Sequence, residues 1–184
     1  GPLEETPFED IYKLFETNYF GTIRVTQQVV PVMRKQGKGL IINMSSIGGR
    51  IGLPFQSIYT ASKFAIESLT EALRMELKPF GIRVCLIEPG DYHTNVNYNR
   101  ITIIPQKESP YHKRLKAYFD LLENNINKGS NPEKIGRLIL RIVRTRRPRL
   151  RYRSGKLFEK ITPLASNLIP TPVFEWFLAR FYRL

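Results

Sequence analysis

The chain has 184 residues, enough for one domain with a hydrophobic core, and its 42% hydrophobic and 24% charged residues exclude wholesale disorder. A single cysteine excludes an intrachain disulfide, and no apolar run is long enough to span a bilayer. The net charge is +13, and residues 133–184 hold 13 Lys and Arg against 3 Asp and Glu. These features predict a cytoplasmic or membrane-surface protein.

The first half of the chain alternates between helix and strand patterns. A helix is predicted over 7–34, with Thr6 as its N-cap and an apolar stripe interrupted by a polar residue, Asn18. A short apolar run at 39–45 favours a buried strand, and a second long helix follows at about 57–79.

The second half begins with another buried strand at 82–90, followed by a mixed segment at 91–130. A helix with Asn131 as N-cap, a short strand within 148–155, and one or two amphipathic helices around the break at 170–172 complete the chain. Helices that alternate with apolar strands predict an α/β fold with a parallel sheet, in a single domain spanning 1–184.

The stretch "SSIGGRIGLPFQSIYTASKFA" carries the clearest chemical signal. Tyr59 and Lys63 lie one helical turn apart, so both side chains can project into one cleft. A tyrosine that acts as a base needs its pKa of about 10 lowered, and a neighbouring ammonium favours the phenolate. Ser46, at the end of the preceding strand, can orient a substrate oxygen. The alternative is an aromatic ring packed under a lysine stem.

Four stretches together carry a resemblance to a known family: "ETNYFGT" at 16–22, "GLIINMSSIGG" at 39–49, "IYTASKFAIESLTEALRMEL" at 58–77 and "GIRVCLIEPGDYHTN" at 81–95. The chain resembles the short-chain dehydrogenase/reductase family, with the nearest likeness to the hydroxysteroid and retinol dehydrogenase-like branches. The resemblance implies a Rossmann-like, doubly wound parallel sheet and an NAD(P)-dependent oxidoreductase that interconverts an apolar alcohol and its ketone or aldehyde.

The resemblance also implies a catalytic tetrad. Tyr59 would transfer the proton, Lys63 would lower its pKa and hold the nicotinamide ribose, and Ser46 would position the substrate oxygen. Asn18 would anchor a water molecule that links Lys63 to solvent; a buried amide at a helix kink is the alternative. No metal is implied.

The same family pattern assigns the segment after the second strand. Pro89, Gly90 and Thr94 would cradle the nicotinamide end of NAD or NADP, although Thr94 could instead be an N-cap. The residue that would select between NAD and NADP, and the strand, glycine-rich turn and helix that bind pyrophosphate, do not occur in residues 1–184. We therefore expect the first four strands of the family sheet to be absent from this chain.

The segment 91–130 corresponds to the family's substrate loop. We expect Tyr92 and its neighbours either to line an apolar pocket or to fasten the loop to the core. The apolar and aromatic candidates are Tyr92, Tyr98, Ile101, Ile103, Ile104, Tyr111, Leu115, Tyr118 and Phe119.

The basic extension at 145–184 has several interpretations. It could lie at a membrane interface, pack on its own subunit or contact a partner subunit, and its arginines could simply guard an edge strand. The arginines lack a recognition motif, so nucleic acid is not an expected partner. The resemblance implies a homodimer or homotetramer. The alternative function is a non-enzymatic membrane-surface or protein-interaction module.

The open strand edge leads to a first prediction. Residues 1–184 expressed alone should bind no nicotinamide cofactor and should aggregate, because the apolar strand at 39–45 would lack one neighbour. Light scattering and a nucleotide titration measure both properties. A monodisperse sample that melts cooperatively and binds NADPH would contradict the prediction.

Overall fold

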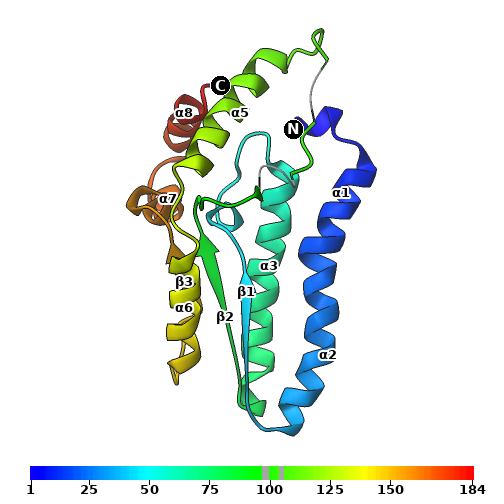
Figure 1. The fold of residues 1–184 in the computed structure, drawn as a ribbon, viewed down its shortest axis with the longest axis vertical. Coiled ribbons are helices and arrows are strands. Elements are labelled where there is room, and N and C mark those ends of the chain that lie inside the picture. Colours follow the sequence, from blue (N-terminus) through cyan, green and yellow to red (C-terminus); the bar gives the residue numbers. More distant parts are fainter. Residues whose placement is uncertain (97–99, 104–105) are drawn as a thin grey trace.

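The computed structural model describes residues 1–96, 100–103 and 106–184. Within them, three parallel strands form one sheet in the order β1 (Gly39–Met44), β2 (Ile82–Pro89) and β3 (Arg151–Ser154). Helices lie on both sides of this sheet (Figure 1). The predicted α/β fold with a parallel sheet is therefore confirmed.

Side chains alternate between the two faces of the sheet and enter two separate cores. On one face Ile41 and Val84 pack with residues of the helices α2 (Gly21–Lys35) and α3 (Ser57–Glu76), which flank the sheet on that side. On the other face Cys85 and Ile87 pack against α6 (Glu133–Arg144), including its fully buried Ile142. Because the strands are covered on both sides, they read as continuous apolar runs in the sequence.

The first long helix consists of α1 (Phe8–Phe15), a π-helical segment η2 (Glu16–Phe20) and α2 (Gly21–Lys35). It begins one residue later than predicted, and the proposed N-cap is wrong. The hydroxyl of Thr6 donates to the carbonyl of Pro2, at 2.6 Å, and so belongs to the preceding 3-10 turn η1 (Leu3–Glu5). Pro7 takes the N-cap position with extended backbone angles.

The second long helix, α3 (Ser57–Glu76), follows β1 after a short 3-10 turn, η3 (Ile47–Gly49). It ends in another 3-10 turn, η4 (Lys78–Phe80), and at Gly81, which has a positive φ of 71°. A Cβ atom at position 81 would lie 2.2 Å from the carbonyl oxygen of Gly37. Only glycine therefore permits this turn into β2.

The remaining described helices are α5 (His112–Asn127), α6 (Glu133–Arg144), α7 (Leu157–Leu168) and α8 (Thr171–Tyr182). Asn131 caps α6 as predicted, since its side chain accepts a hydrogen bond from the backbone amide of Glu133 at 2.8 Å. The two ends of segment 91–130 meet in a bridge between Tyr92 and Ser130. The segment is thus a loop that leaves and re-enters the fold at one place.

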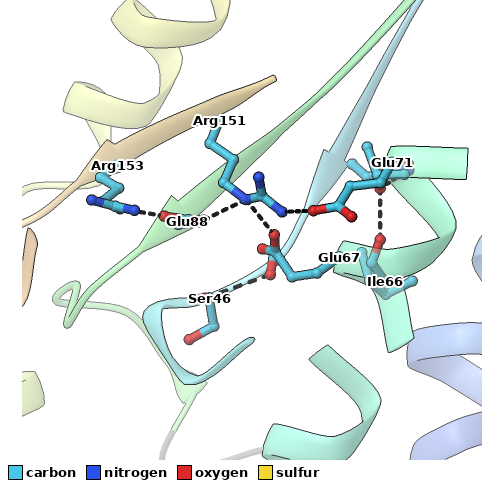
Figure 2. A network of polar contacts seen from close by, with 10 residues as sticks. Ser46, Ile66, Glu67, Glu71, Glu88, Arg151 and Arg153 are labelled. Carbon is cyan, nitrogen blue, oxygen red and sulfur yellow. Dashed lines mark hydrogen bonds and ion pairs between the residues drawn. The ribbon is translucent and has the colours of Figure 1, made fainter. Parts of the chain in front are cut away.

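Two arginines of β3 form a buried ion cluster with carboxylates of α3 and β2 (Figure 2). Arg151 Nε lies 2.8 Å from Glu67 Oε2 and 3.2 Å from Glu88 Oε1, and the guanidinium also contacts Glu71. Arg153 Nε lies 2.7 Å from the other oxygen of Glu88, whose side chain is fully buried. Part of the basic stretch therefore neutralises buried carboxylates instead of facing solvent.

This cluster predicts a large loss of stability on removal of its central cation. Arg151→Met should lower the free energy of unfolding of the full-length protein by about 3 kcal/mol, because, among the residues that the structure describes, Glu67 loses its only arginine partner and Glu88 one of two. Arg137→Met, which removes an exposed pair with Glu133, should cost about 0.5 kcal/mol or less. Urea unfolding measures both values, and equal losses would contradict a special role for Arg151.

Candidate functional site

The predicted site residues gather at one edge of the sheet, where the parallel strands end. Ser46 follows β1, Pro89 closes β2, and Tyr59 lies in the first turn of α3. In open parallel sheets this edge is where ligands bind. A cavity of about 1230 Å³ lies here, and these predicted residues line it: Asn18, Ser46, Tyr59, Pro89, Gly90, Tyr92 and Thr94.

Tyr59 and Ser46 both line the cavity. Ser46 Oγ accepts a hydrogen bond from the backbone amide of Gly48 at 3.1 Å. Burial raises the pKa of Tyr59, while the nearby Ser46 hydroxyl and the charge of Arg100 act in the opposite direction. A hydroxyl pair at the cavity wall can contact one oxygen of a bound alcohol or ketone.

Lys63 is close to Tyr59 but is not among the residues that line the cavity. Its Nζ is 5.8 Å from the centre of the Tyr59 ring and donates to the carbonyl oxygen of Met44 at 3.1 Å. Burial of the phenol has the largest effect on the pKa of Tyr59, and a lowering of that pKa by Lys63 stays a prediction. Burial also lowers the pKa of Lys63 itself.

Asn18 occupies the middle of the π-helical segment of the first helix. Its Nδ2 donates to Ser62 Oγ at 3.0 Å, and Ser62 Oγ donates to the carbonyl oxygen of Tyr59 at 2.7 Å. Its own carbonyl accepts from the hydroxyl of Thr22 at 2.9 Å. Single π turns inside α-helices are frequent at functional sites. Asn18 thus joins the first helix to the turn that carries Tyr59.

The segment after β2 is tightly packed at Gly90. A Cβ atom at position 90 would lie 2.0 Å from Glu159 Oε2, so only glycine fits beside α7. Thr94 is exposed on the cavity side of the chain. Tyr92 is buried, and its hydroxyl lies 2.5 Å from Ser154 Oγ. Tyr92 therefore fastens the loop to β3 as well as lining the cavity.

The expected substrate loop contributes only part of the apolar wall. Ile101, Ile103, Tyr118 and Phe119 line the cavity, whereas Leu115 is fully buried in a core beside Tyr118. Tyr111 lies outside the lining and donates to a carboxylate of Glu4. Tyr98 and Ile104 fall outside the described residues.

The sequence analysis missed two groups of cavity residues. Arg100 and Asp91 lie in the wall, and the electrostatic influence of each reaches Tyr59. No motif surrounds either residue, so no local signal indicated them. The helices α7 and α8 supply several aromatic and aliphatic side chains, among them Phe158, Ile161, Phe174, Phe177 and Phe181. One side of these two helices therefore packs on its own subunit, which was one interpretation of the C-terminal extension.

No cluster of histidine, cysteine and carboxylate side chains suitable for a metal ion occurs among residues 1–96, 100–103 and 106–184. In the same described part of the chain, no helix combines the length and apolar character needed to cross a membrane.

Comparisons with known proteins agree with this geometry. The family model for short chain dehydrogenases matches residues 1–102. The 3-ketodihydrosphingosine reductase of Bacteroides thetaiotaomicron is 36% identical over 183 residues, covering 99% of this chain and 68% of the relative. Human 17-beta-hydroxysteroid dehydrogenase type 1 is 32% identical, covering 86% of this chain and 50% of that protein.

Solved structures extend the likeness to the fold. A short-chain dehydrogenase from Streptomyces avermitilis matches with a TM-score of 0.78 and 30% identity, over 96% of this chain and 64% of that one. A gluconate 5-dehydrogenase from Burkholderia cenocepacia, in complex with NADP and tartrate, and an NAD+-bound xylitol dehydrogenase match with TM-scores of 0.52 and 0.51, over 64% and 54% of this chain and 44% and 38% of those chains. This chain spans between about two fifths and two thirds of the length of these proteins. The chain belongs to the short-chain dehydrogenase family.

Proposed function

We propose that the protein is an NAD(P)-dependent oxidoreductase that interconverts an apolar alcohol and its ketone or aldehyde. The observation that carries this proposal is the placement of Tyr59 and Ser46 together at the wall of a large cavity, where the Ser46 hydroxyl acts on the pKa of Tyr59, with Lys63 one turn further along α3. Family membership supports the reaction type, since named relatives are reductases and dehydrogenases.

Each residue has a distinct role in the proposed reaction. Tyr59 gives its proton to the oxygen of a carbonyl substrate, or takes one from an alcohol. Ser46 donates a hydrogen bond to the same oxygen, and the short loop to Gly48 keeps its hydroxyl in place. Asn18 fixes the first turns of α3 through Ser62. We also propose that Asn18 anchors a water molecule that links Lys63 to solvent.

The donors at this edge fit the nicotinamide end of NAD or NADP. The Lys63 ammonium would bind ribose hydroxyls, and the Thr94 hydroxyl would bind the nicotinamide end. The backbone of Pro89–Gly90 would lie against the same end of the cofactor. When bound, the cofactor supplies or accepts the hydride. Two related structures hold NADP and NAD+, which supports nicotinamide use of either type.

The lining of the cavity favours a long apolar substrate. Side chains of α5, α7 and α8 that face it are mostly aromatic and aliphatic, and its volume of about 1230 Å³ exceeds that of an ordinary small-molecule pocket. One relative is named for its action on 3-ketodihydrosphingosine, a long-chain ketone. We infer a substrate in which the reacting carbonyl or alcohol carries a long hydrocarbon chain.

A homodimer or homotetramer completes the proposal. Val25 and Val32 on α2, and Phe64 and Met75 on α3, are exposed apolar side chains on the two long helices. Burying such residues against a second copy would remove apolar area from water. Sedimentation of the full-length protein measures this assembly.

Replacing the proton donor should remove activity. Tyr59→Phe in the full-length protein should lower kcat about a thousandfold or more, because the reacting oxygen loses its acid and base. Fluorescence titration should show unchanged cofactor affinity. Tyr12→Phe, which alters an exposed tyrosine of α1, serves as the control and should keep full activity. Substantial residual turnover in Tyr59→Phe would refute the assignment.

Arg100 should set part of the pH dependence. Alcohol oxidation needs deprotonated Tyr59, so its rate rises with pH through the pKa of that residue. The positive charge of Arg100 lowers this pKa, and Arg100→Gln should therefore move the rise to higher pH, by roughly half a pH unit. Initial rates across the pH range measure the midpoint. Arg137→Gln on the exposed face of α6 should leave it in place; an unmoved midpoint in Arg100→Gln contradicts the role.

A further inference from the structure

We propose that α7 and α8 form a docking surface for an anionic lipid bilayer, and that a membrane-dissolved substrate enters the cavity through it. The second half of this inference rests on the proposed function. It starts from a concentration of exposed apolar residues: Leu157 is 76%, Leu168 85% and Trp176 61% exposed. α8 packs against both α7 and α5, on the left side of the molecule in Figure 1.

The outer face of α8 has the composition of an interfacial helix. Val173, Trp176 and Arg180 are three or four residues apart, Phe177 follows Trp176 directly, and Leu184 follows the end of the helix; all five are exposed. The rings of Trp176 and Phe177 are in edge-to-face contact, with centres 5.0 Å apart. Tryptophan is enriched where a membrane meets water, because its ring is apolar and its indole N–H is polar. This face therefore suits the headgroup region of a bilayer.

The charges around this surface select an anionic partner. Lys156, Lys160, Arg180 and Arg183 lie in the two helices and at their ends. Of the two acidic residues in 156–184, Glu159 is buried and accepts from the backbone amide of Lys156, which leaves Glu175 on the surface. Basic residues beside an apolar helix face bind phosphatidylglycerol and similar headgroups.

The same helices form part of the cavity wall. Phe158, Ile161, Phe177 and Phe181 are exposed to solvent, and all four also line the cavity that contains Tyr59. A long-chain substrate could thus pass from the bilayer into the site without crossing water. The equilibrium constant for transfer of a substrate from the bilayer into water falls about fourfold for each methylene group that the substrate carries. A route that avoids water therefore favours lipid substrates.

The arginine-rich segment 144–149 lies elsewhere and is no part of this surface. It precedes β3, so it sits at the amino-terminal edge of the parallel sheet, whereas α7 follows β3 at the opposite edge. Arg74 and Arg83 hold it there by donating to the carbonyls of Pro148 and Thr145, each at 2.8 Å. Within the described part of the basic extension, exposed apolar side chains and basic side chains therefore occur together in α7 and α8.

Vesicle binding tests the docking surface without any substrate. The full-length protein should sediment with vesicles of phosphatidylcholine and phosphatidylglycerol, and less with phosphatidylcholine alone or at high salt. Leu168→Ser/Trp176→Ser should weaken binding to the anionic vesicles by about tenfold or more, because two large apolar side chains are lost. Neither residue lines the cavity.

The matched control is Leu140→Ser/Val143→Ser, which alters exposed apolar residues of α6 and should leave vesicle binding unchanged. Wild-type protein that stays in solution, or equal losses in the two double variants, would overturn the proposal. So would unchanged vesicle binding with a smaller oligomer for Leu168→Ser/Trp176→Ser on size-exclusion chromatography, which would assign the face to a second copy of the chain.

Measurements of turnover distinguish failure of this inference from failure of the proposed function. Leu168→Ser/Trp176→Ser should reduce a short, water-soluble ketone at the wild-type rate, but a long-chain ketone embedded in vesicles about tenfold more slowly. If the wild-type protein reduces neither ketone, the proposed function fails while vesicle binding still decides the docking surface. If the variant reduces the embedded ketone as fast as wild type, entry through this surface is refuted.

Discussion

The arrangement of the site depends on the ion pairs that the guanidinium of Arg151 forms. It draws carboxylates of α3 and β2 to β3, in a region where unpaired charges would be strongly unfavourable. Glu67 lies one turn beyond Lys63, and Glu88 directly precedes Pro89. Burial raises the pKa of Glu67, and the nearby hydroxyl of Ser45, the neighbour of Ser46, lowers it. The cluster therefore fixes together the three segments that carry the predicted site residues.

The electrostatic state of Tyr59 suits the reductive direction of the proposed reaction. Burial raises its pKa, so the phenol keeps its proton at neutral pH and can give it to an oxygen that becomes negatively charged. Ser46 and Arg100 oppose this effect and keep the proton transferable. The site thus combines an apolar enclosure, which retains the proton, with polar groups that stabilise its loss.

The helices α7 and α8 serve two environments at once. Their inner side chains close the cavity around an apolar ligand, and their outer side chains expose tryptophan, leucine and arginine to solvent. Such a wall would let a protein docked on a bilayer take its substrate directly from the lipid. For a ligand that is nearly insoluble in water, this would shorten the path from the bilayer to Tyr59.

The sequence by itself determined the elements whose signal is local. Apolar runs identified β1 and β2, and helical spacing placed Tyr59 and Lys63 on one face of α3. The prediction of Thr6 as N-cap was wrong, because its hydroxyl donates to the carbonyl of Pro2 in the preceding turn, and the capping pattern in the sequence gives no sign of that turn.

Tertiary structure alone decided the polarity and contacts of the site. Lys63 donates to a carbonyl of β1. Arg100 reaches Tyr59 from a segment without any motif, and Arg151 faces carboxylates that are 84 and 63 residues away in the sequence. Such contacts depend on how distant elements pack, and helix or strand periodicity carries no information about that packing.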